Sequence, residues 1–348
     1  MSATISSATF ESSSGIKIQR VPIRAFPNFW ATVYVVSMNE QHILIDTGSG
    51  TDDSHDDLLN GLSQVGIHPI DLTHILLTHA HIDHYGGLPR LRSLTDAKIG
   101  CHELDIQTVA HHETRLALLS RRLASFLADS GLAQEPQEQL LGIHRFTKAL
   151  YRSVPVDFTY RTIKEQIPGL EVIHLPGHCP GHVAMRLEDV IFCGDMVVEG
   201  LTPHIAPESI QPHGGLDHYL ESLDRFQEWA WGARLILNGH DDVITDLPAR
   251  IGVTHQNLIR RMSKTVEALS QSLTVAEVCT EVYGEMGGYN QLLTIEKTGA
   301  YIEYLYERGM IEVTNLDEVE QGLPAKYRRL RVIPDDEILR KLKSPVLE

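Results

Sequence analysis

Long apolar runs and positive charge are both scarce in this sequence. No segment approaches the roughly 18 consecutive apolar residues that a membrane-spanning helix needs. The 348 residues include 30 Lys and Arg against 46 Asp and Glu, which gives a formal net charge of −16. Proteins that coat nucleic acid or an anionic membrane need a positive surface to attract phosphate. We therefore expect neither nucleic acid nor a membrane among the partners of this protein.

Cysteine is scarce as well. The four residues are Cys101, Cys179, Cys193 and Cys279, and no two of them form a Cys-x-x-Cys pair. A chain of this length can bury a core without disulfide bonds, so we expect free thiols and a reducing, cytoplasmic location. Residues 1–14 are rich in Ser and Thr and lack the basic and apolar regions of a signal peptide. They are expected to form a disordered tail.

Short β-branched runs and helical stretches alternate between residues 15 and 247. Apolar residues recur at three- and four-residue spacing from about 102 to 165, which predicts a helical insert. Short strands are predicted on both sides of it, for example at 73–77 and 190–193. This order predicts a layered α/β domain with an inserted helical segment.

Residues 248–348 have a different pattern and are predicted to form a small C-terminal domain. A long helix at about 248–271 leads to Thr274 and Glu277, which are spaced as a helix-capping box. A helix at about 291–308 and a hairpin formed by 310–313 and 327–332 complete a winged-helix-like pattern. The second helix lacks the positive face that DNA binding requires, so we interpret this domain as a structural or dimerisation element, with a homodimer as the expected assembly.

Histidine, in contrast, is frequent, with 19 residues, and several of them are clustered. Four potential metal ligands occur within six residues, directly after the predicted strand 73–77. Burying such groups without partners would cost several kcal/mol, so a purely structural role is disfavoured. Three further candidates each follow a predicted strand. The full set is His79, His81, Asp83, His84, His178, Asp195 and His240. Five imidazoles and two carboxylates supply between one and a half and two metal coordination shells.

The ordered motifs HAHIDH, PGHCPGH, CGD and NGH, with DTG upstream, resemble the metallo-β-lactamase superfamily over residues 15–245. The resemblance implies an αββα sandwich and two divalent metal ions. One ion would be bound by His79, His81 and His178 and the other by Asp83, His84 and His240. Asp195 would bridge the two ions, and Asp46 would lie beneath them as a structural residue.

The branch of the superfamily is indicated by the bridging position and by the tail. Asp195 replaces the Cys that many lactamases carry there, as in the glyoxalase II, lactonase and nuclease branches. The PGHCPGH form and the C-terminal pattern resemble β-lactamase-like hydrolases with a C-terminal helical or winged-helix domain, which include thioesterases and a ribonuclease. Nitrogen and oxygen ligands without thiolate suit Zn²⁺ best, and Fe or Mn also fit.

We therefore predict a dinuclear metal hydrolase that cleaves a thioester or ester of a small anionic metabolite. Two ions about 3.5–4 Å apart would lower the pKa of a bridging water toward about 7 and supply hydroxide at neutral pH. Asp83 and Asp195 are the predicted catalytic carboxylates.

Three alternatives stay open. A ribonuclease or other phosphodiesterase is disfavoured by the charge of −16. A mononuclear-iron persulfide dioxygenase would need only His79, His178 and Asp195, and the retention of the other ligands counts against it. A metal-stabilised binding protein is the non-enzymatic alternative.

Residues that contact the substrate are less clearly indicated. His182, His204 and His213 are candidates for lining the pocket. Arg121 and Arg122 could contact an anionic substrate from the insert, although paired arginines on a helix usually form a solvated face. The insert contains eight basic and eight acidic residues, so the net charge lies elsewhere in the chain. We expect this neutral segment to border the substrate entrance.

Overall fold

Two β-sheets face each other at the centre of the protein. The computed structural model describes residues 6–149, 151–198 and 202–332. The first sheet has seven strands in the order of the chain: β1 (Ala8–Glu11), β2 (Lys17–Phe26), β3 (Phe29–Met38), β4 (Gln41–Ile45), β5 (His74–Leu76), β6 (Lys98–Cys101) and β7 (Phe158–Thr159). The second has the order β11 (Leu235–Leu237), β10 (Val190–Phe192), β9 (Val183–Leu187) and β8 (Leu170–His174).

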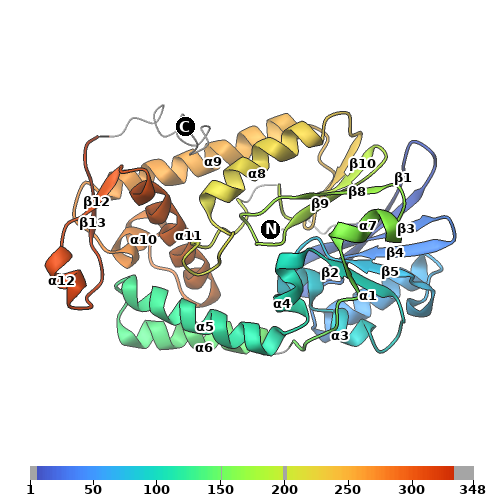
Figure 1. Ribbon diagram of the computed structural model, residues 1–348, viewed down its shortest axis with the longest axis horizontal. Helices are drawn as coiled ribbons and strands as arrows, with labels where there is room; N and C mark the ends of the chain where they lie inside the picture. The colour runs from blue at the N-terminus through green and yellow to red at the C-terminus, as the bar shows by residue number, and fades with distance from the viewer. Residues whose placement is uncertain (1–5, 150, 199–201, 333–348) are drawn as a thin grey trace.

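Alternation of apolar residues along the strands gives each sheet two buried faces. In β4, Ile43 and Ile45 pack against Phe192 of the second sheet, whereas Leu44 faces the other way, into a cluster with Leu58. Helices α1 (Asp52–Gln64) and α3 (Leu88–Leu91) cover this outer face. Helices α8 (Leu216–Trp229) and α9 (Leu247–Ala268) cover the second sheet (Figure 1). The α/β sandwich predicted from the sequence is confirmed.

The predicted insert is helical. Its main helices are α4 (Ile106–Val109), α5 (His112–Asp129) and α6 (Gln134–Lys148), and α7 (Ile163–Gln166) follows β7. Helices α5 and α6 pack together as a hairpin that extends from the sandwich toward the C-terminal segment (Figure 1). The hairpin therefore connects the sandwich with the C-terminal segment, and α6 packs against α11 (Gly288–Glu307).

The C-terminal segment contains α10 (Val275–Tyr283), α11 (Gly288–Glu307), β12 (Ile311–Val313), α12 (Leu316–Glu320) and β13 (Tyr327–Arg329). The predicted capping box is present, because the Thr274 hydroxyl accepts from the Glu277 N–H while the Glu277 carboxylate accepts from the Thr274 N–H. Strands β12 and β13 pair antiparallel, as the hairpin prediction required. One apolar cluster joins Leu127 of the insert, Phe226 of α8 and Tyr301 of α11, so the insert and the C-terminal helices share a core with the sandwich.

The prediction of a disordered tail over residues 1–14 is wrong for its described part. Residues 8–11 form β1, which pairs antiparallel with β2. Phe10 packs against the core between the sheets, and the backbone N–H groups of Ser13 and Ser14 donate to Asp189 and Glu188. Many hydroxyl side chains suggested a solvated segment, but an edge strand needs only one apolar face and backbone partners.

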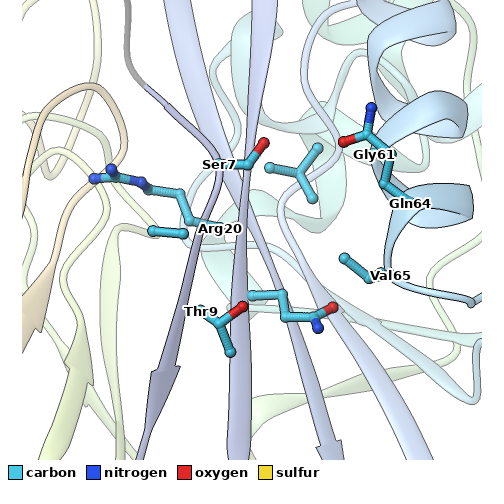
Figure 2. Close-up of a pocket in the computed structure, with 9 residues that line it drawn as sticks. Ser7, Thr9, Arg20, Gly61, Gln64 and Val65 are labelled. Carbon is cyan, nitrogen blue, oxygen red and sulfur yellow. The ribbon is translucent and has the colours of Figure 1, made fainter.

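Strand β1 also borders a small hollow. It has a volume of about 200 Å³ and lies between β1, β2 and α1 (Figure 2). Ser7, Thr9, Arg20, Gln64 and Val65 are among its lining residues, and none of the predicted metal ligands belongs to it. Within the described part of the chain, no helix combines the length and the apolar character needed to cross a membrane.

Candidate metal centre

The seven predicted ligands meet at one edge of the sandwich, because each follows a strand that ends there. His79 and His81 lie in the loop after β5, and Asp83 and His84 lie in the short helix α2 (Ile82–Tyr85) that follows. The remaining three come directly after strands of the second sheet: His178 after β8, Asp195 after β10 and His240 after β11. The structure therefore places these seven side chains in three overlapping groups of neighbours.

Three overlapping groups of ligand atoms could each hold a metal ion. They are His79, His81 and His178; His79, His84 and Asp195; and Asp83, His84 and His240. In the first, His79 Nε2 lies 3.1 Å from His81 Nδ1 and 3.3 Å from His178 Nε2. In the third, Asp83 Oδ2 lies 3.5 Å from His240 Nε2.

Asp195 lies between the first and third groups. Its Oδ2 is 3.5 Å from His178 Nε2 and 3.0 Å from His240 Nε2, and its Oδ1 is 3.3 Å from His84 Nε2. The buried Oδ1 has no hydrogen-bond donor among the described residues. A buried carboxylate oxygen without a donor is costly unless a cation satisfies it.

Hydrogen bonds behind the cluster determine which nitrogen of each imidazole faces the centre. The Nδ1–H of His178 donates to the carbonyl of His204 at 2.7 Å, and the Nδ1–H of His240 donates to the carbonyl of Trp30 at 2.8 Å. A carbonyl only accepts, so in the neutral ring each Nε2 carries a lone pair toward the centre.

The same reasoning applies to His84, which contacts Asp46 directly, and to His79, which contacts the Thr78 hydroxyl. His84 Nδ1 lies 2.9 Å from Asp46 Oδ2, which also accepts from the Thr78 hydroxyl at 2.7 Å. That hydroxyl can therefore accept from His79 Nδ1, 3.1 Å away. These four histidines then turn a lone pair toward the centre, and an assembly of lone pairs and carboxylates fits divalent cations.

The pKa directions agree with this demand for positive charge. Burial lowers the pKa of His79 and His81 well below the usual value. Burial also acts to lower the pKa of His240, but the Asp195 and Asp83 carboxylates outweigh it and raise the pKa to about 9. The surroundings of Asp195 therefore favour a positive charge, which either a protonated imidazole or a bound metal ion can supply.

Two glycines in the motifs are required by close contacts. Gly177 has φ +126°, and a Cβ there would lie 2.3 Å from the backbone nitrogen of Tyr219. A Cβ on Gly239 would lie 2.4 Å from Asp195 Oδ1 and 2.7 Å from His84 Cε1. The glycines of the PGH and NGH motifs thus let helix α8 and the loop after β11 approach the ligands.

The three histidines predicted to line the pocket have different positions. His182 is fully buried, and its Nε2 accepts from the Asp195 N–H at 3.1 Å, so it supports a ligand from beneath and does not line a pocket. His204 is half-buried and bonds Glu296 at 2.8 Å, next to its contact with His178. His213 is exposed and contacts Glu208 and His218, outside the ligand cluster.

Asp105 is a supporting residue that sequence reasoning missed. Its buried carboxylate accepts from the Gly181 N–H at 3.1 Å, and burial raises its pKa to about 7. A Cβ on Gly181 would lie 2.3 Å from Asp105 Cγ, so the second glycine of PGHCPGH marks this contact. An acidic residue within a helix-rich insert gave no sequence signal for it.

Comparison with known proteins agrees with this geometry. The model of the metallo-β-lactamase superfamily matches residues 31–230, more than half of the chain. The chain belongs to the metallo-β-lactamase superfamily. Members of this superfamily bind divalent metals, and the His and Asp cluster lies where the superfamily motifs predict it.

Two of the curated relatives of this superfamily member have names that state an enzymatic activity. An atrochrysone carboxyl ACP thioesterase from Claviceps purpurea is 24% identical over 264 residues, which cover 72% of this chain and 66% of the relative. A hydroxyacylglutathione hydrolase from Shewanella loihica is 24% identical over 257 residues, covering 72% and 77%. The chain thus spans slightly less than two thirds of the length of the first relative.

Solved structures extend the fold beyond the family model. A metallo-β-lactamase family protein from Thermus thermophilus has a TM-score of 0.72 and 25% identity, covering 90% of this chain and 98% of that one. A β-lactamase domain protein from Burkholderia ambifaria has a TM-score of 0.67 and 18% identity, covering 92% and 93%. The overall fold of about nine tenths of this chain therefore recurs in these two structures.

The contact between Asp46 and His84 gives a testable expectation. Asp46→Asn is the suitable change, because asparagine has the same size and tolerates the φ of 61° at this position. Its oxygen can still accept from the Thr78 N–H, but its amide nitrogen would face the Nδ1–H of His84. We expect roughly 10–100-fold weaker metal binding, as measured by competition with a chromophoric chelator. Unchanged metal affinity with an unchanged circular dichroism spectrum would contradict this role.

Proposed function

We propose that this protein is a dinuclear metal-dependent hydrolase of thioesters. The observation that carries the proposal is the convergence of seven acceptor groups in which Asp195 is shared by the two outer sets. One ion would be held by His79, His81 and His178, and the other by Asp83, His84 and His240. Zn²⁺ is the preferred ion for this donor set, which Fe and Mn can also occupy.

The substrate class is supported by the curated relatives. One is named as a thioesterase that acts on an acyl group attached to a carrier protein, and the other as a hydrolase of acylglutathione, which is also a thioester. Both substrates are acyl groups on a thiol carrier that bears negative charge. We therefore extend to this chain the hydrolysis of an anionic thioester.

The residues of the chain have separate roles in this proposal. Two divalent ions held by these residues would supply hydroxide at neutral pH and positive charge near the scissile carbonyl. Asp46 and the His204 carbonyl hold His84 and His178 in one tautomer and one orientation. Asp195, supported by His182, keeps the two ligand sets at a common carboxylate. No serine or cysteine nucleophile is required.

The test is a substrate panel with the metal-loaded protein. We expect two equivalents of metal per chain by elemental analysis, turnover of acyl thioesters, and loss of turnover after dialysis against a chelator. Phosphodiester cleavage without thioester turnover would favour a phosphodiesterase instead. One iron per chain with oxidation of a persulfide would favour a dioxygenase, and tight retention of an uncleaved thioester would favour a binding protein.

We also propose the setting in which the enzyme acts. The four cysteines are buried free thiols, which suits a reducing compartment such as the cytoplasm. The C-terminal helices and the β12–β13 hairpin are interpreted as a winged-helix-like element with a structural or dimerisation role. Size-exclusion chromatography with light scattering tests the homodimer.

A further inference from the structure

One end of the α5–α6 hairpin is attached to the metal centre. His112 begins α5, and its Nε2–H donates to the carbonyl of Lys148, the last residue of α6, at 2.8 Å. His112 Nδ1 then accepts from the hydroxyl of Tyr85 at 2.8 Å, and Tyr85 directly follows the ligand His84. This chain of contacts places the start of α5 and the end of α6 beside the ligand helix. We call residues 112–122 and 142–152 the inner half of the hairpin.

The charges of the hairpin are sorted along its length. The outer half, which includes the turn, carries Asp129, Glu135 and Glu138. The inner half carries one acidic residue, Glu113, and six cations: Arg115, Arg121, Arg122, Arg145, Lys148 and Arg152. The neutrality of the insert as a whole therefore conceals a strongly cationic half next to the site.

The part of the chain that the structure describes contains no salt bridge between these six cations and a carboxylate. Elsewhere in the protein, arginines pair with acids, as Arg24 does with Asp57 and Arg234 with Asp189. Among the described residues, no side chain of the six forms an ion pair, and Arg152 donates only to backbone carbonyls. Four of them, Arg121, Arg122, Arg145 and Arg152, are exposed.

The acidic groups near this surface are engaged elsewhere. Glu113 accepts from the hydroxyl and N–H of Ser153, and Asp105 accepts from the Gly181 N–H. Glu296 of α11 pairs with His204. Burial lowers the pKa of Arg115 and Arg122 lowers it further, whereas Asp105 raises it. Glu296 and Asp83 likewise act to raise the pKa of Lys148. The positive charge that no nearby carboxylate offsets is therefore that of the four exposed arginines, in a protein of net charge −16.

We propose that the inner half of the α5–α6 hairpin binds the phosphate-bearing carrier portion of the thioester, the phosphopantetheine of coenzyme A or of an acyl carrier protein. This inference rests on the proposed function and names its substrate class. Arginine and lysine are the preferred donors to a phosphate group. Cations that are not neutralised also attract a phosphate-bearing substrate and so raise its rate of encounter with the protein.

The spread of the cations along the hairpin favours a phosphopantetheine carrier over glutathione. Arg122 lies ten residues beyond His112 in α5, which corresponds to about 15 Å along the helix axis. Phosphopantetheine separates its thioester from its phosphate by a long uncharged arm, whereas glutathione carries its carboxylates close to the sulfur. The positive charge begins at Lys148, beside the ligands, and continues outward to Arg122 and Arg145. This extended distribution matches the longer carrier.

The experiment compares two thioesters of the same acyl group, one on coenzyme A and one on N-acetylcysteamine, which has no phosphate. Arg122→Gln and Arg145→Gln remove exposed cations without disturbing buried contacts. We expect each single variant to lower kcat/KM for the coenzyme A thioester roughly threefold to tenfold relative to the N-acetylcysteamine thioester, mainly through KM. The double variant should lower this ratio further, and added salt should lower it in the wild type. Lys264→Gln removes an exposed cation of α9 and is the matched control. It should leave the ratio of the two kcat/KM values unchanged.

A binding measurement separates this inference from the proposed function. Calorimetric titration of the metal-loaded protein with free coenzyme A does not require hydrolysis, and we expect the double variant to bind it at least tenfold more weakly than the wild type. Failure of the wild type to cleave any thioester would contradict the proposed function and leave this measurement intact. Equal losses on both thioesters, or unchanged coenzyme A binding, would overturn the carrier-binding role. A glutathione thioester as sensitive as the coenzyme A thioester would overturn the phosphate assignment.

A phosphopantetheinylated carrier protein forms the second arm of the experiment. Sensitivity of its acyl thioester to the same two variants would support the inference and identify a protein-bound carrier, whereas sensitivity of coenzyme A alone would support it and identify the free cofactor. RNA cleavage that depends on Arg122 and Arg145, without any thioester dependence, would overturn it.

Discussion

Asp195→Ala is expected to reduce turnover by more than the roughly 100-fold that loss of an outer supporting residue costs in metal sites. Asp195 lies within reach of both outer ligand sets, with His178 and His240 at 3.5 and 3.0 Å from its Oδ2. Without Asp195, each outer ligand set keeps its imidazole lone pairs. The two sets then no longer share a negative charge that holds two cations close together. We expect metal content to fall below two equivalents per chain together with activity.

Elemental analysis and initial rates on the same preparation check this expectation. Asp96→Ala removes an exposed carboxylate outside the cluster and serves as the control for the change in net charge. It should retain wild-type metal content and rate. Wild-type activity in Asp195→Ala would eliminate the dinuclear mechanism, because the remaining ligands would then suffice.

Gly239→Ala is expected to have the second largest effect. The added methyl would lie 2.4 Å from Asp195 Oδ1 and 2.7 Å from His84 Cε1, both far closer than van der Waals contact. Asp195 and His84 are buried and bonded behind the cluster, so they cannot move without losing these bonds. We expect at least about a 100-fold loss of activity and weaker binding of metal, with retained secondary structure.

A second glycine provides the matched control. Gly252 lies in α9, and a Cβ there meets no atom within 4 Å. Gly252→Ala should keep full activity and raise the melting temperature slightly, since alanine favours a helix by up to about 1 kcal/mol over glycine. Loss of activity in both variants would point to a general sensitivity of the fold, whereas full activity in Gly239→Ala would show that the loop after β11 can move away from Asp195.

Much of the metal centre could be predicted before any coordinates, because its signals are local. HAHIDH, PGH, CGD and NGH each stand directly after a short apolar strand, and strand ends meet at a common edge in layered α/β folds. The capping box at Thr274 is also a local signal, since it depends on residues three positions apart. Such features depend on residue type and spacing, which a sequence displays openly.

Other features could not be predicted because they depend on contacts between distant segments. Residues 8–11 gain their strand conformation from β2, and a Ser- and Thr-rich segment gives no sign of that partner. His182 looks like a pocket residue in sequence, but the packing of β9 against β10 turns it under Asp195. The contact between Asp105 and Gly181 spans 76 positions.

By itself, the sequence determined the superfamily, the ligand types and the order in which they reach the site. Only the tertiary structure decided which nitrogen of the histidines faces the centre and where the cations of the insert lie relative to the ligands. Hydrogen bonds to His204 and Trp30 make the first choice, and the contact between His112 and Lys148 makes the last. These contacts join segments that are far apart in the chain, so residue spacing alone carries no information about them.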